Sequence, residues 1–408
     1  MSVALEAETR IAKEAFEACC ACGSRDLAPI ADLPAFPHVG VYLENPSDAD
    51  AYPPVDNALS ACAVCGHLQL GYAVDPGFLY TGSFQHRTSQ SANARQCNEF
   101  LFAFAQRVCA GKPLDLVAEI GCNDTFLLRK FAERGVDVAG VDPILKGRER
   151  QFIAGLPPDL AARFHVVGDF VERADFAASL GRSPDLYVSN MVFEHLKDPF
   201  AVTRALLDGA GDGALFIVAV PGAEFMLTNC RFDQLSHQHY HRFTVPSFRH
   251  MIERAGGEIV DIAVNYVVWG QILIAFRKGR TSAAAAPEMA FSLTQIEDAF
   301  ALFRRQIATL RDQLDMFGDK PAFGFGAAQN FPPFAYFYGA PLPFDVILDD
   351  DPKRQNRSYP GLPVRIEAPG ASYEGAVGLL TGPDHARALV GRMDQLRFDH
   401  VIVPFLAL

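Results

Sequence analysis

The sequence lacks any apolar run long enough to cross a lipid bilayer. A membrane-spanning helix needs roughly 20 apolar residues, whereas the longest apolar stretch, residues 214–220, has the length of a β-strand and ends in Pro221. Residues 1–18 also lack the basic start and apolar run of a secretory signal, since they are acidic and helical in composition. We therefore expect no membrane partner and a cytoplasmic location.

Positive charge is also scarce. The 408 residues include 36 Lys and Arg against 48 Asp and Glu, which gives a net charge of −12 at pH 7. A chain of this sign repels the phosphate backbone of nucleic acids. Nucleic acid is therefore not an expected partner.

Three segments of different composition follow one another, as expected for a chain longer than one hydrophobic core usually fills. Residues 1–90 are rich in Cys, Pro and short loops, so they cannot bury a large core unaided. Residues 91–285 alternate apolar runs with amphipathic segments, which predicts a doubly wound α/β domain. An Ala- and Ser-rich stretch, residues 281–286, marks its end, and residues 294–316 have helical spacing. Residues 286–408 then predict a smaller α/β unit.

The strand predictions rest on individual apolar runs. Seven of them fall in the central segment: LDLVAEIG, VDVAGVD, RFHVVGDF, DLYVSN, ALFIVAVP, GEIVDIAV and QILIAFR. Four more fall in the C-terminal segment: AFGFGAA, FDVILDD, GAVGLLTG and HVIVPF. No internal repeat of fixed period accompanies them.

Four of the nine cysteines form two equivalent Cys-x-x-Cys-Gly turns, Cys19 with Cys22 and Cys62 with Cys65. In each turn two thiolates can close on one ion, while the glycine relieves crowding where backbone amides face sulfur. Four thiolates complete a tetrahedron with no open position. We therefore predict a structural zinc ion that supplies folding energy to this core-poor segment. Chance spacing and a redox dithiol are the alternatives.

Other cysteines have no comparable spacing. Cys20 lies between two expected ligands and is predicted to be a bystander. Cys97, Cys109 and Cys230 are predicted to be packed or free thiols.

The first central strand ends in a glycine turn that opens into an amphipathic segment. Gly121 lets the backbone turn sharply and lets a ligand approach the end of the strand. A dinucleotide-binding loop would have further glycines after this one, whereas here Asn123 occupies such a position. Glu119 and Asp124 make the loop acidic, which suits a sulfonium and an ammonium and repels a pyrophosphate. Asp142 ends the second strand, where a carboxylate can accept hydrogen bonds from both ribose hydroxyls. The pattern favours S-adenosylmethionine over a nicotinamide dinucleotide.

Three further candidates follow later strands. Asp169 ends the third strand, in position to reach an adenine amine. Asn190 ends the fourth strand, and residues 190–195 are expected to lie over the methyl-bearing face of the cofactor. The alternatives are structural: Asp142 or Asp169 can simply end a strand in a turn, and His195 can be a satisfied histidine at a helix start.

Taken in order, these parts resemble the bacterial sugar C-methyltransferase family, which acts on nucleotide-linked deoxysugars. The similarity covers nearly the whole chain. The matching segments are the four cysteines, EIGCNDTFLL, residues 190–195, FDQLSHQH, GFGAAQNF and DDDPKRQNRSYPGLPV. The resemblance implies a zinc-binding N-terminal domain, a central S-adenosylmethionine domain and a C-terminal α/β domain that binds the nucleotide part of the acceptor or closes over the site.

The sequence departs from that family at its acid–base residues. Residues 236–239 read Ser-His-Gln-His where the family typically has Tyr-His-Glu-His, and His86 stands where a tyrosine is usual. The glutamine cannot exchange a proton near neutral pH, and the serine has no phenol. We expect His237 or His239 to be the base, with the other orienting the acceptor, and His195 to face the methyl group. A polar surface loop carrying three histidines is the structural alternative.

The turn at residues 324–329 could admit a phosphate against a helix N-terminus, with Arg354 and Arg357 close enough in sequence to help bind a diphosphate. Tight strand–helix packing would require the same glycines. The leading hypothesis is C-methylation of a nucleotide-linked deoxysugar beside a keto group. Transfer to oxygen or nitrogen, a protein that binds S-adenosylmethionine without catalysis, and a nicotinamide oxidoreductase are the alternatives.

Overall fold

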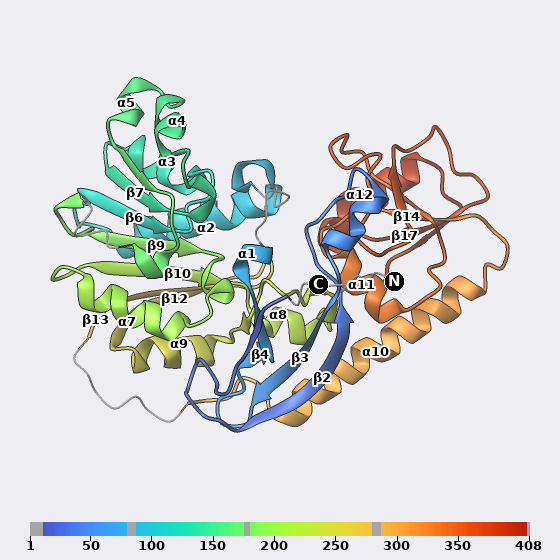
Figure 1. The fold of residues 1–408 in the computed structure, drawn as a ribbon, viewed down its shortest axis with the longest axis horizontal. Helices are drawn as coiled ribbons and strands as arrows, with labels where there is room; N and C mark the ends of the chain where they lie inside the picture. Colours follow the sequence, from blue (N-terminus) through green and yellow to red (C-terminus); the bar gives the residue numbers. More distant parts are fainter. Residues whose placement is uncertain (1–10, 80–86, 175–179, 280–286, 406–408) are drawn as a thin grey trace, which may run out of the picture.

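The computed structural model describes residues 11–79, 87–174, 180–279 and 287–405 (Figure 1). His86 and the predicted boundary at 281–286 lie outside these residues. In the part of the chain that is described, no helix is both long and apolar enough to span a membrane.

The central sheet contains all seven predicted strands, in the order β12-β13-β10-β9-β6-β7-β8. Five of them run parallel, whereas β13 pairs antiparallel with β10 and β12 pairs antiparallel with β13. The sheet is therefore mixed rather than purely parallel. The strands are β6 (Leu116–Ile120), β7 (Asp137–Val141), β8 (Phe164–Val167), β9 (Leu186–Asn190), β10 (Leu215–Val220), β12 (Gly257–Asn265) and β13 (Gln271–Lys278).

Helices pack on both faces of this sheet (Figure 1). Side chains point alternately to the two faces along each strand, so they divide between two apolar clusters. One cluster includes residues of α2 and α3, and the other includes residues of α7 and α9. Strands covered on both faces are buried throughout, which explains the near-continuous apolar runs in the sequence. The main helices are α2 (Ala92–Val108), α3 (Phe126–Ala132), α7 (Pro199–Gly209) and α9 (Val245–Arg254).

The N-terminal segment forms a four-stranded antiparallel sheet in the order β11-β4-β3-β2. Its edge strand β11 comes from the histidine-rich segment, and His241 pairs with Gln69. The N-terminal sheet is thus completed by a strand more than 150 residues later in the chain. The strands are β2 (Leu27–Phe36), β3 (Val55–Cys62), β4 (Leu68–Leu70) and β11 (His241–Arg242), and β1 (Lys13–Ala15) pairs separately with β5 (Tyr72–Val74).

The C-terminal segment forms a five-stranded parallel sheet in the order β16-β15-β14-β17-β18. Four of its strands were predicted. The fifth, β16, has three residues of which only Ile366 is buried, so it leaves no apolar run in the sequence. The strands are β14 (Ala322–Phe325), β15 (Val346–Leu348), β16 (Arg365–Glu367), β17 (Val377–Leu380) and β18 (His400–Ile402).

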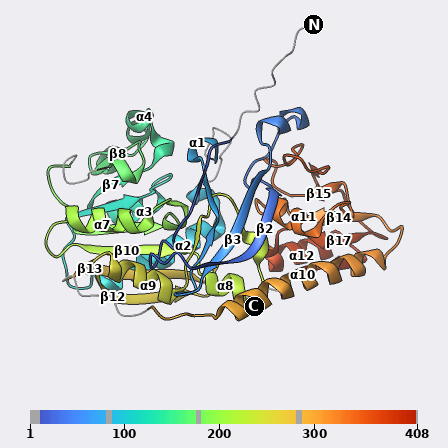
Figure 2. The same cartoon turned by 60° about the horizontal axis from the view of Figure 1, so that its bottom comes forward.

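A long helix, α10 (Leu293–Asp315), runs beneath the N-terminal and C-terminal sheets, close to the predicted residues 294–316 (Figures 1 and 2). Ser292 and Gln295 form a capping box at its start, which fixes that end of the helix. Its buried face joins one apolar cluster with β2, β3, α8 (Ala223–Thr228) and α11 (Phe331–Tyr338). The N-terminal and C-terminal segments therefore share one core.

Candidate functional site

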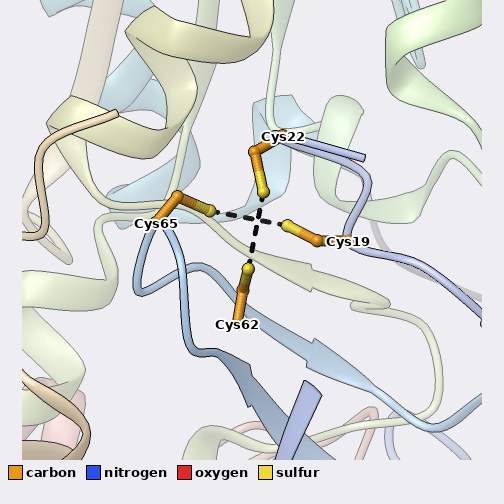
Figure 3. A group of neighbouring side chains, drawn as sticks. All are labelled: Cys19, Cys22, Cys62 and Cys65. Atoms are coloured by element: carbon orange, nitrogen blue, oxygen red, sulfur yellow. Dashed lines mark hydrogen bonds between the residues drawn. The ribbon is translucent and has the colours of Figure 1, made fainter. Parts of the chain in front are cut away.

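The four predicted cysteines converge on one point (Figure 3). Cys19 Sγ lies 3.5 Å from Cys65 Sγ, Cys22 Sγ lies 3.4 Å from Cys62 Sγ, and all four sulfurs lie within 4.8 Å of one another. These separations exceed the roughly 2.05 Å of a disulfide. They approach the ~3.8 Å between thiolates around a tetrahedral zinc ion with bonds of about 2.3 Å. The donor set and its spacing therefore fit zinc.

The two cysteine turns have the same backbone geometry. In the first, Gly23 N donates to Cys19 O at 2.8 Å, and in the second Gly66 N donates to Cys62 O at 2.9 Å. Both glycines have positive φ angles, +79° and +68°, which glycine adopts without steric cost. Each trailing glycine therefore supplies the backbone conformation that closes its turn.

Hydrogen bonds among the four sulfurs favour the thiolate form at two of the cysteines, Cys22 and Cys62. Hydrogen bonds to the other cysteines, led by the bond from Cys19, lower the pKa of Cys62. The same kind of interaction, led by that with Cys19, lowers the pKa of Cys22 to about 7, whereas hydrogen bonds to the other three cysteines raise the pKa of Cys19. Thiolates are the form that binds metal.

Gly121 makes the sharp turn predicted at the end of β6. Its φ is +73° and its N–H donates to Val141 O at 2.8 Å. A Cβ at this position would lie 2.3 Å from Val192 Cγ2, a distance that real Cβ atoms do not tolerate. The turn therefore requires glycine for space as well as for conformation.

Substituting Gly121 with alanine should weaken S-adenosylmethionine binding at least tenfold, because the methyl group displaces the loop or Val192. Gly135→Ala is the matched control, since Gly135 also has a positive φ, +85°, but nothing lies within 4 Å of its added Cβ. Both variants should lose about 1–2 kcal/mol of stability through backbone strain. Isothermal titration separates the two, and equal affinities in both variants would contradict a role for this turn in cofactor binding.

Asp142 holds the glycine loop against the end of β7. Its Oδ2 accepts from Asn123 N at 2.8 Å, and its Oδ1 accepts from Ile144 N at 2.9 Å. Each carboxylate oxygen has a second acceptor site. Burial raises the pKa of Asp142, while these backbone bonds oppose the shift.

The other acidic residues of the loop have different surroundings. Glu119 is buried, and its Oε2 has no hydrogen-bond partner among the described residues. Burial raises the pKa of Glu119 well above its usual range, and the nearby Asp142 and Asp124 raise it further. Asp124 Oδ2 accepts from Ser89 N at 3.0 Å and from Ser89 Oγ at 2.5 Å. Ser89 therefore ties the loop to the segment that precedes α2, a contact that the sequence did not predict.

Asp169 follows β8 and Asn190 is the last residue of β9, so both lie at the same edge of the sheet as Gly121. Asp169 is half-buried and forms an ion pair with Arg173 at 3.6 Å. Asn190 Oδ1 accepts from Gln271 Nε2 at 2.7 Å. Gln271 begins β13, so the sequence gives no local signal that it orients Asn190.

His237 is completely buried against the N-terminal sheet. Its Nε2 lies 3.0 Å from Phe36 O, and its Nδ1 lies 3.2 Å from Asn57 Nδ2. A carbonyl only accepts and an amide nitrogen only donates, so His237 is neutral with its proton on Nε2. Both ring nitrogens therefore hold the histidine segment to the N-terminal sheet.

Burial lowers the pKa of His237 to about 4, against about 6.5 in the unfolded chain. Below pH 6.5 this histidine binds a proton in the unfolded chain but not in the folded one. Its contribution to the free energy of unfolding is therefore fully present above pH 6.5 and is lost as the pH falls toward 4. Between pH 7 and pH 5 this histidine should cost about 2 kcal/mol of stability. Urea unfolding at both pH values should give a smaller difference for His237→Gln than for the wild type, and equal differences would contradict the assignment.

His195 ends the 3-10 turn Phe193–His195 that follows β9, and its ring lies 4.6 Å, between centroids, from that of His239, which precedes β11. His195 Nδ1 lies 2.8 Å from Gln238 O, and His239 Nδ1 lies 2.8 Å from an Arg242 nitrogen. Glu194 Oε1 lies 3.9 Å from His195 Nε2. Burial raises the pKa of Glu194 to about 8. Glu194 and Arg242 stand next to predicted residues but were not themselves predicted to act.

A cavity of about 380 Å³ lies where the three segments of the chain meet. Tyr42 from the N-terminal segment, Arg87 from the segment before α2, and Trp269 after β12 contribute to it. Gln329 and Arg354, both from the predicted phosphate region, also line it. Its size is typical of small-molecule sites.

Residues 87–91 separate this cavity from the glycine loop. Thr88 N donates to Asn123 Oδ1 at 3.2 Å on one side, while Arg87 and Gln90 line the cavity on the other. Lys353 Nζ donates to Gln90 Oε1 at 3.3 Å across it. A ligand in the cavity would therefore lie close to whatever the glycine loop binds.

The turn after β14 repeats the hydrogen bonds of the glycine loop. Gly326, with φ +93°, donates to Leu348 O at 2.8 Å. Asp349 then accepts from Ala327 N at 2.6 Å and from Asp351 N at 2.8 Å. Gly121 and Asp142 have the same arrangement: the glycine N–H donates to the next strand, and the aspartate accepts from two backbone N–H groups.

Of the two arginines predicted to assist there, only Arg354 lines the cavity, and its NH1 also donates to Ala327 O at 3.0 Å. Arg357 instead forms an ion pair with Glu44 at 3.0 Å. Lys353 and Arg87 also line the cavity, as does Asp351, which forms an ion pair with Arg354 at 3.7 Å. The predicted pair of arginines is therefore not assembled at one point.

Comparison with known proteins identifies the central part of the chain. Residues 92–262 match the model of a family described as a methyltransferase domain. The C-methyltransferase NovU of Streptomyces niveus is 25% identical over 256 residues, which are 63% of this chain and 59% of that protein. The matched part thus spans about three fifths of the relative's length.

Solved structures give weaker likenesses. The glycopeptide N-methyltransferase MtfA is 11% identical with a TM-score of 0.36 and covers 44% of this chain and 89% of its own. The CcbJ methyltransferase of Streptomyces caelestis is 14% identical with a TM-score of 0.34 and covers 45% and 89%. Scores below 0.5 do not establish a common fold, so the assignment rests on the sequence matches.

Proposed function

We propose that this chain, whose residues 92–262 are the domain of an S-adenosylmethionine-dependent methyltransferase, methylates a nucleotide-linked deoxysugar at a carbon beside a keto group. The observation that carries the proposal is a histidine pair that includes His195 on the segment after β9, the segment whose Val192 closely approaches the Gly121 turn. The similarity to a C-methyltransferase favours carbon as the methylated atom.

The glycine loop has the features expected of a cofactor site. Gly121 leaves space that a Cβ would fill, and Asp142 offers acceptors for ribose hydroxyls. The buried Glu119 oxygen has no described partner, and an ammonium placed beside it would donate a hydrogen bond to this oxygen and oppose the rise in the pKa of Glu119. When bound, S-adenosylmethionine supplies an electrophilic methyl group. Asp169 and Asn190 would contact its adenine and its methyl-bearing side, as the sequence suggested.

The hydrogen bonds of the two histidines assign them different roles. The carbonyl of Gln238 can only accept, so His195 Nδ1 carries the proton and Nε2 carries the lone pair. A guanidinium can only donate, so Nδ1 of His239 accepts from Arg242 and its proton lies on Nε2. His195 is therefore the base in this proposal, and His239 donates a hydrogen bond to the keto oxygen.

These roles give a balanced reaction. The C–H bond beside the ketone breaks, its proton goes to His195 Nε2, and the electron pair moves onto the keto oxygen as an enolate. His239 Nε2–H holds that oxygen, with Arg242 fixing the ring. With S-adenosylmethionine held by the glycine loop, the enolate carbon would take its methyl group, and the sulfur would leave neutral with the C–S electron pair. Glu194 Oε1 lies 3.9 Å from His195 Nε2, but burial raises the pKa of Glu194 to about 8, so this carboxyl group adds little charge stabilisation near neutral pH.

His237 has a structural part in this proposal. Both of its ring nitrogens are occupied by the N-terminal sheet, so it positions the segment that carries His239. The sequence led us to expect His237 or His239 as the base. Because His237 has a structural part, the candidates are His239 and His195, and the lone pair on His195 Nε2 favours His195.

The cavity between the segments is proposed to hold the nucleotide part of the acceptor. The Gly326 turn and Asp349, close in sequence to the lining residues Ala328 and Asp351, repeat the arrangement of Gly121 and Asp142. Arg354, Lys353 and Arg87 would face a diphosphate. The acceptor would then reach the histidine pair past residues 87–91.

The proposal also includes a structural zinc ion held by Cys19, Cys22, Cys62 and Cys65. Four thiolates leave no position for a substrate. Its effect on the reaction is indirect, because the same N-terminal sheet holds His237 and pairs with β11.

Titration calorimetry with S-adenosylmethionine tests the first part of the proposal. Saturable binding at one site per chain is expected. A titration with a thymidine diphosphate 4-keto-6-deoxyhexose then tests the cavity, and Lys353→Ala should weaken it several-fold, since one phosphate contact is lost. Lys320→Ala, at the far side of the C-terminal sheet beside Asp399, should not. Absence of S-adenosylmethionine binding would refute the proposal.

A further inference from the structure

A second group of metal-ligand atoms lies beside the four-cysteine cluster. Cys20 Sγ lies 3.3 Å from His67 Nε2, which lies 3.4 Å from His241 Nδ1. All three ligand atoms lie within 4.8 Å of one another. Cys20 directly follows Cys19 in the sequence and was predicted to be a bystander of the four-cysteine cluster. In the structure it belongs to this second group instead.

We propose that Cys20, His67 and His241 form a second transition-metal site, distinct from the four-cysteine cluster and suited to zinc. Imidazole and thiolate together are a ligand set that zinc prefers. A tetrahedral zinc ion would separate two imidazole nitrogens by about 3.3 Å, and a nitrogen and a sulfur by about 3.6 Å. The observed contacts of His67 match both separations closely.

Hydrogen bonding alone does not satisfy this group. His67 Nε2 carries either one proton or one lone pair, yet it faces both a sulfur and a second ring nitrogen at contact distance. It can therefore make one good hydrogen bond at most. A cation between the three atoms would instead engage a lone pair from each of them.

The surroundings of the group favour a cation and hold its ligands in place. His67 and His241 are almost completely buried, and the His67 ring packs on Phe243 with centroids 4.6 Å apart. Four thiolates around one Zn²⁺ carry a net charge of −2, so the neighbouring cluster would attract positive charge. Three protein ligands leave a fourth position for water or another small donor.

The site would join two parts of the chain that are distant in sequence. Cys20 belongs to the first cysteine turn and His67 to the second, whereas His241 lies in β11. His239 and Arg242 flank His241 in the same segment. A metal here would fix the strand that carries the proposed hydrogen-bond donor and its arginine.

Metal counting on the full chain tests this site independently of any methyl transfer. The protein is purified without chelator, dialysed against zinc and then freed of excess, and the ions per chain are counted by elemental analysis and native mass spectrometry. Two ions per chain are expected. His67→Phe keeps the ring packing on Phe243 and should retain one ion.

His38→Phe is the matched control, because His38 is another buried histidine of the N-terminal segment that packs against aromatic rings. It should retain two ions. Circular dichroism confirms that each variant is folded, and Cys20→Ser provides a second ligand variant that should also hold one ion. One ion in the wild type, or the same count in His67→Phe and the wild type, would overturn the second site. Loss of methyl transfer with the count unchanged would instead concern the proposed reaction.

Discussion

Replacing His195 with asparagine should lower methyl transfer by about 10²–10⁴-fold, the usual contribution of a general base. Asparagine keeps a donor that can reach Gln238 O, 2.8 Å from the present Nδ1, but it has no basic nitrogen. Affinity for S-adenosylmethionine should not change, because the glycine loop and Asp142 are not altered. Rate measurements and calorimetry on the same preparation test both expectations.

Proton exchange separates the two histidines. In deuterium oxide without S-adenosylmethionine, the wild type should exchange the acceptor proton beside the ketone, and His195→Asn should abolish that exchange. His239→Asn should slow the exchange but not abolish it, because the base is retained while the donor to the keto oxygen is lost. His250→Asn, a buried histidine on α9, serves as the control and should behave as the wild type. The opposite pattern would reverse the two assignments.

The tautomers can be measured without any substrate. Nitrogen-15 spectra of labelled histidine should show His195 protonated on Nδ1 and His239 protonated on Nε2, because their partners are a carbonyl and a guanidinium. In Arg242→Gln, His239 should no longer be confined to the tautomer protonated on Nε2. A wild-type His239 protonated on Nδ1 would refute the assignment whatever the acceptor is.

Replacing Cys62 with serine should abolish zinc binding at the four-cysteine cluster and unfold the N-terminal sheet. Structural zinc contributes about 10–16 kcal/mol in zinc-finger peptides at pH 7, which is comparable to the roughly 5–15 kcal/mol that stabilises a whole domain. Because His237 and β11 depend on this sheet, methyl transfer should fall with it. Zinc analysis and thermal unfolding provide the measurement.

Cys109→Ser is the control for that experiment. Cys109 is also buried, but it lies at the end of α2 and has no neighbouring cysteine in the metal cluster. It should keep its zinc and lose only the small contribution of a buried thiol. Normal zinc content in Cys62→Ser, or equal unfolding temperatures in both variants, would contradict a structural metal there.

Features set by neighbouring residues in the sequence could be predicted. The turn at Gly121 follows from a glycine at the end of an apolar strand, and Asp142 follows from an acid at the end of the next one. The cysteine cluster follows from two equal spacings with trailing glycines. Each of these patterns fixes its own geometry within a few residues.

Features that depend on distant contacts could not be predicted. The sequence does not show that Phe36 and Asn57 occupy both ring nitrogens of His237, or that β11 completes the N-terminal sheet. The protonation of a histidine likewise depends on its partners rather than on its motif. The sequence therefore indicates the histidine-rich segment, while the hydrogen-bond partner of each histidine is visible only in the structure.

The most direct test of the proposed function is a mass-spectrometric screen of deoxysugar nucleotides with S-adenosylmethionine. Both 4-keto and reduced sugars are included, and the products are examined for the gain of one methyl group. We predict a product on a 4-keto sugar, with the new methyl on the carbon beside the ketone and the yield lost in His195→Asn. Transfer only to reduced sugars, or to no sugar while S-adenosylmethionine still binds, would contradict C-methylation beside a ketone.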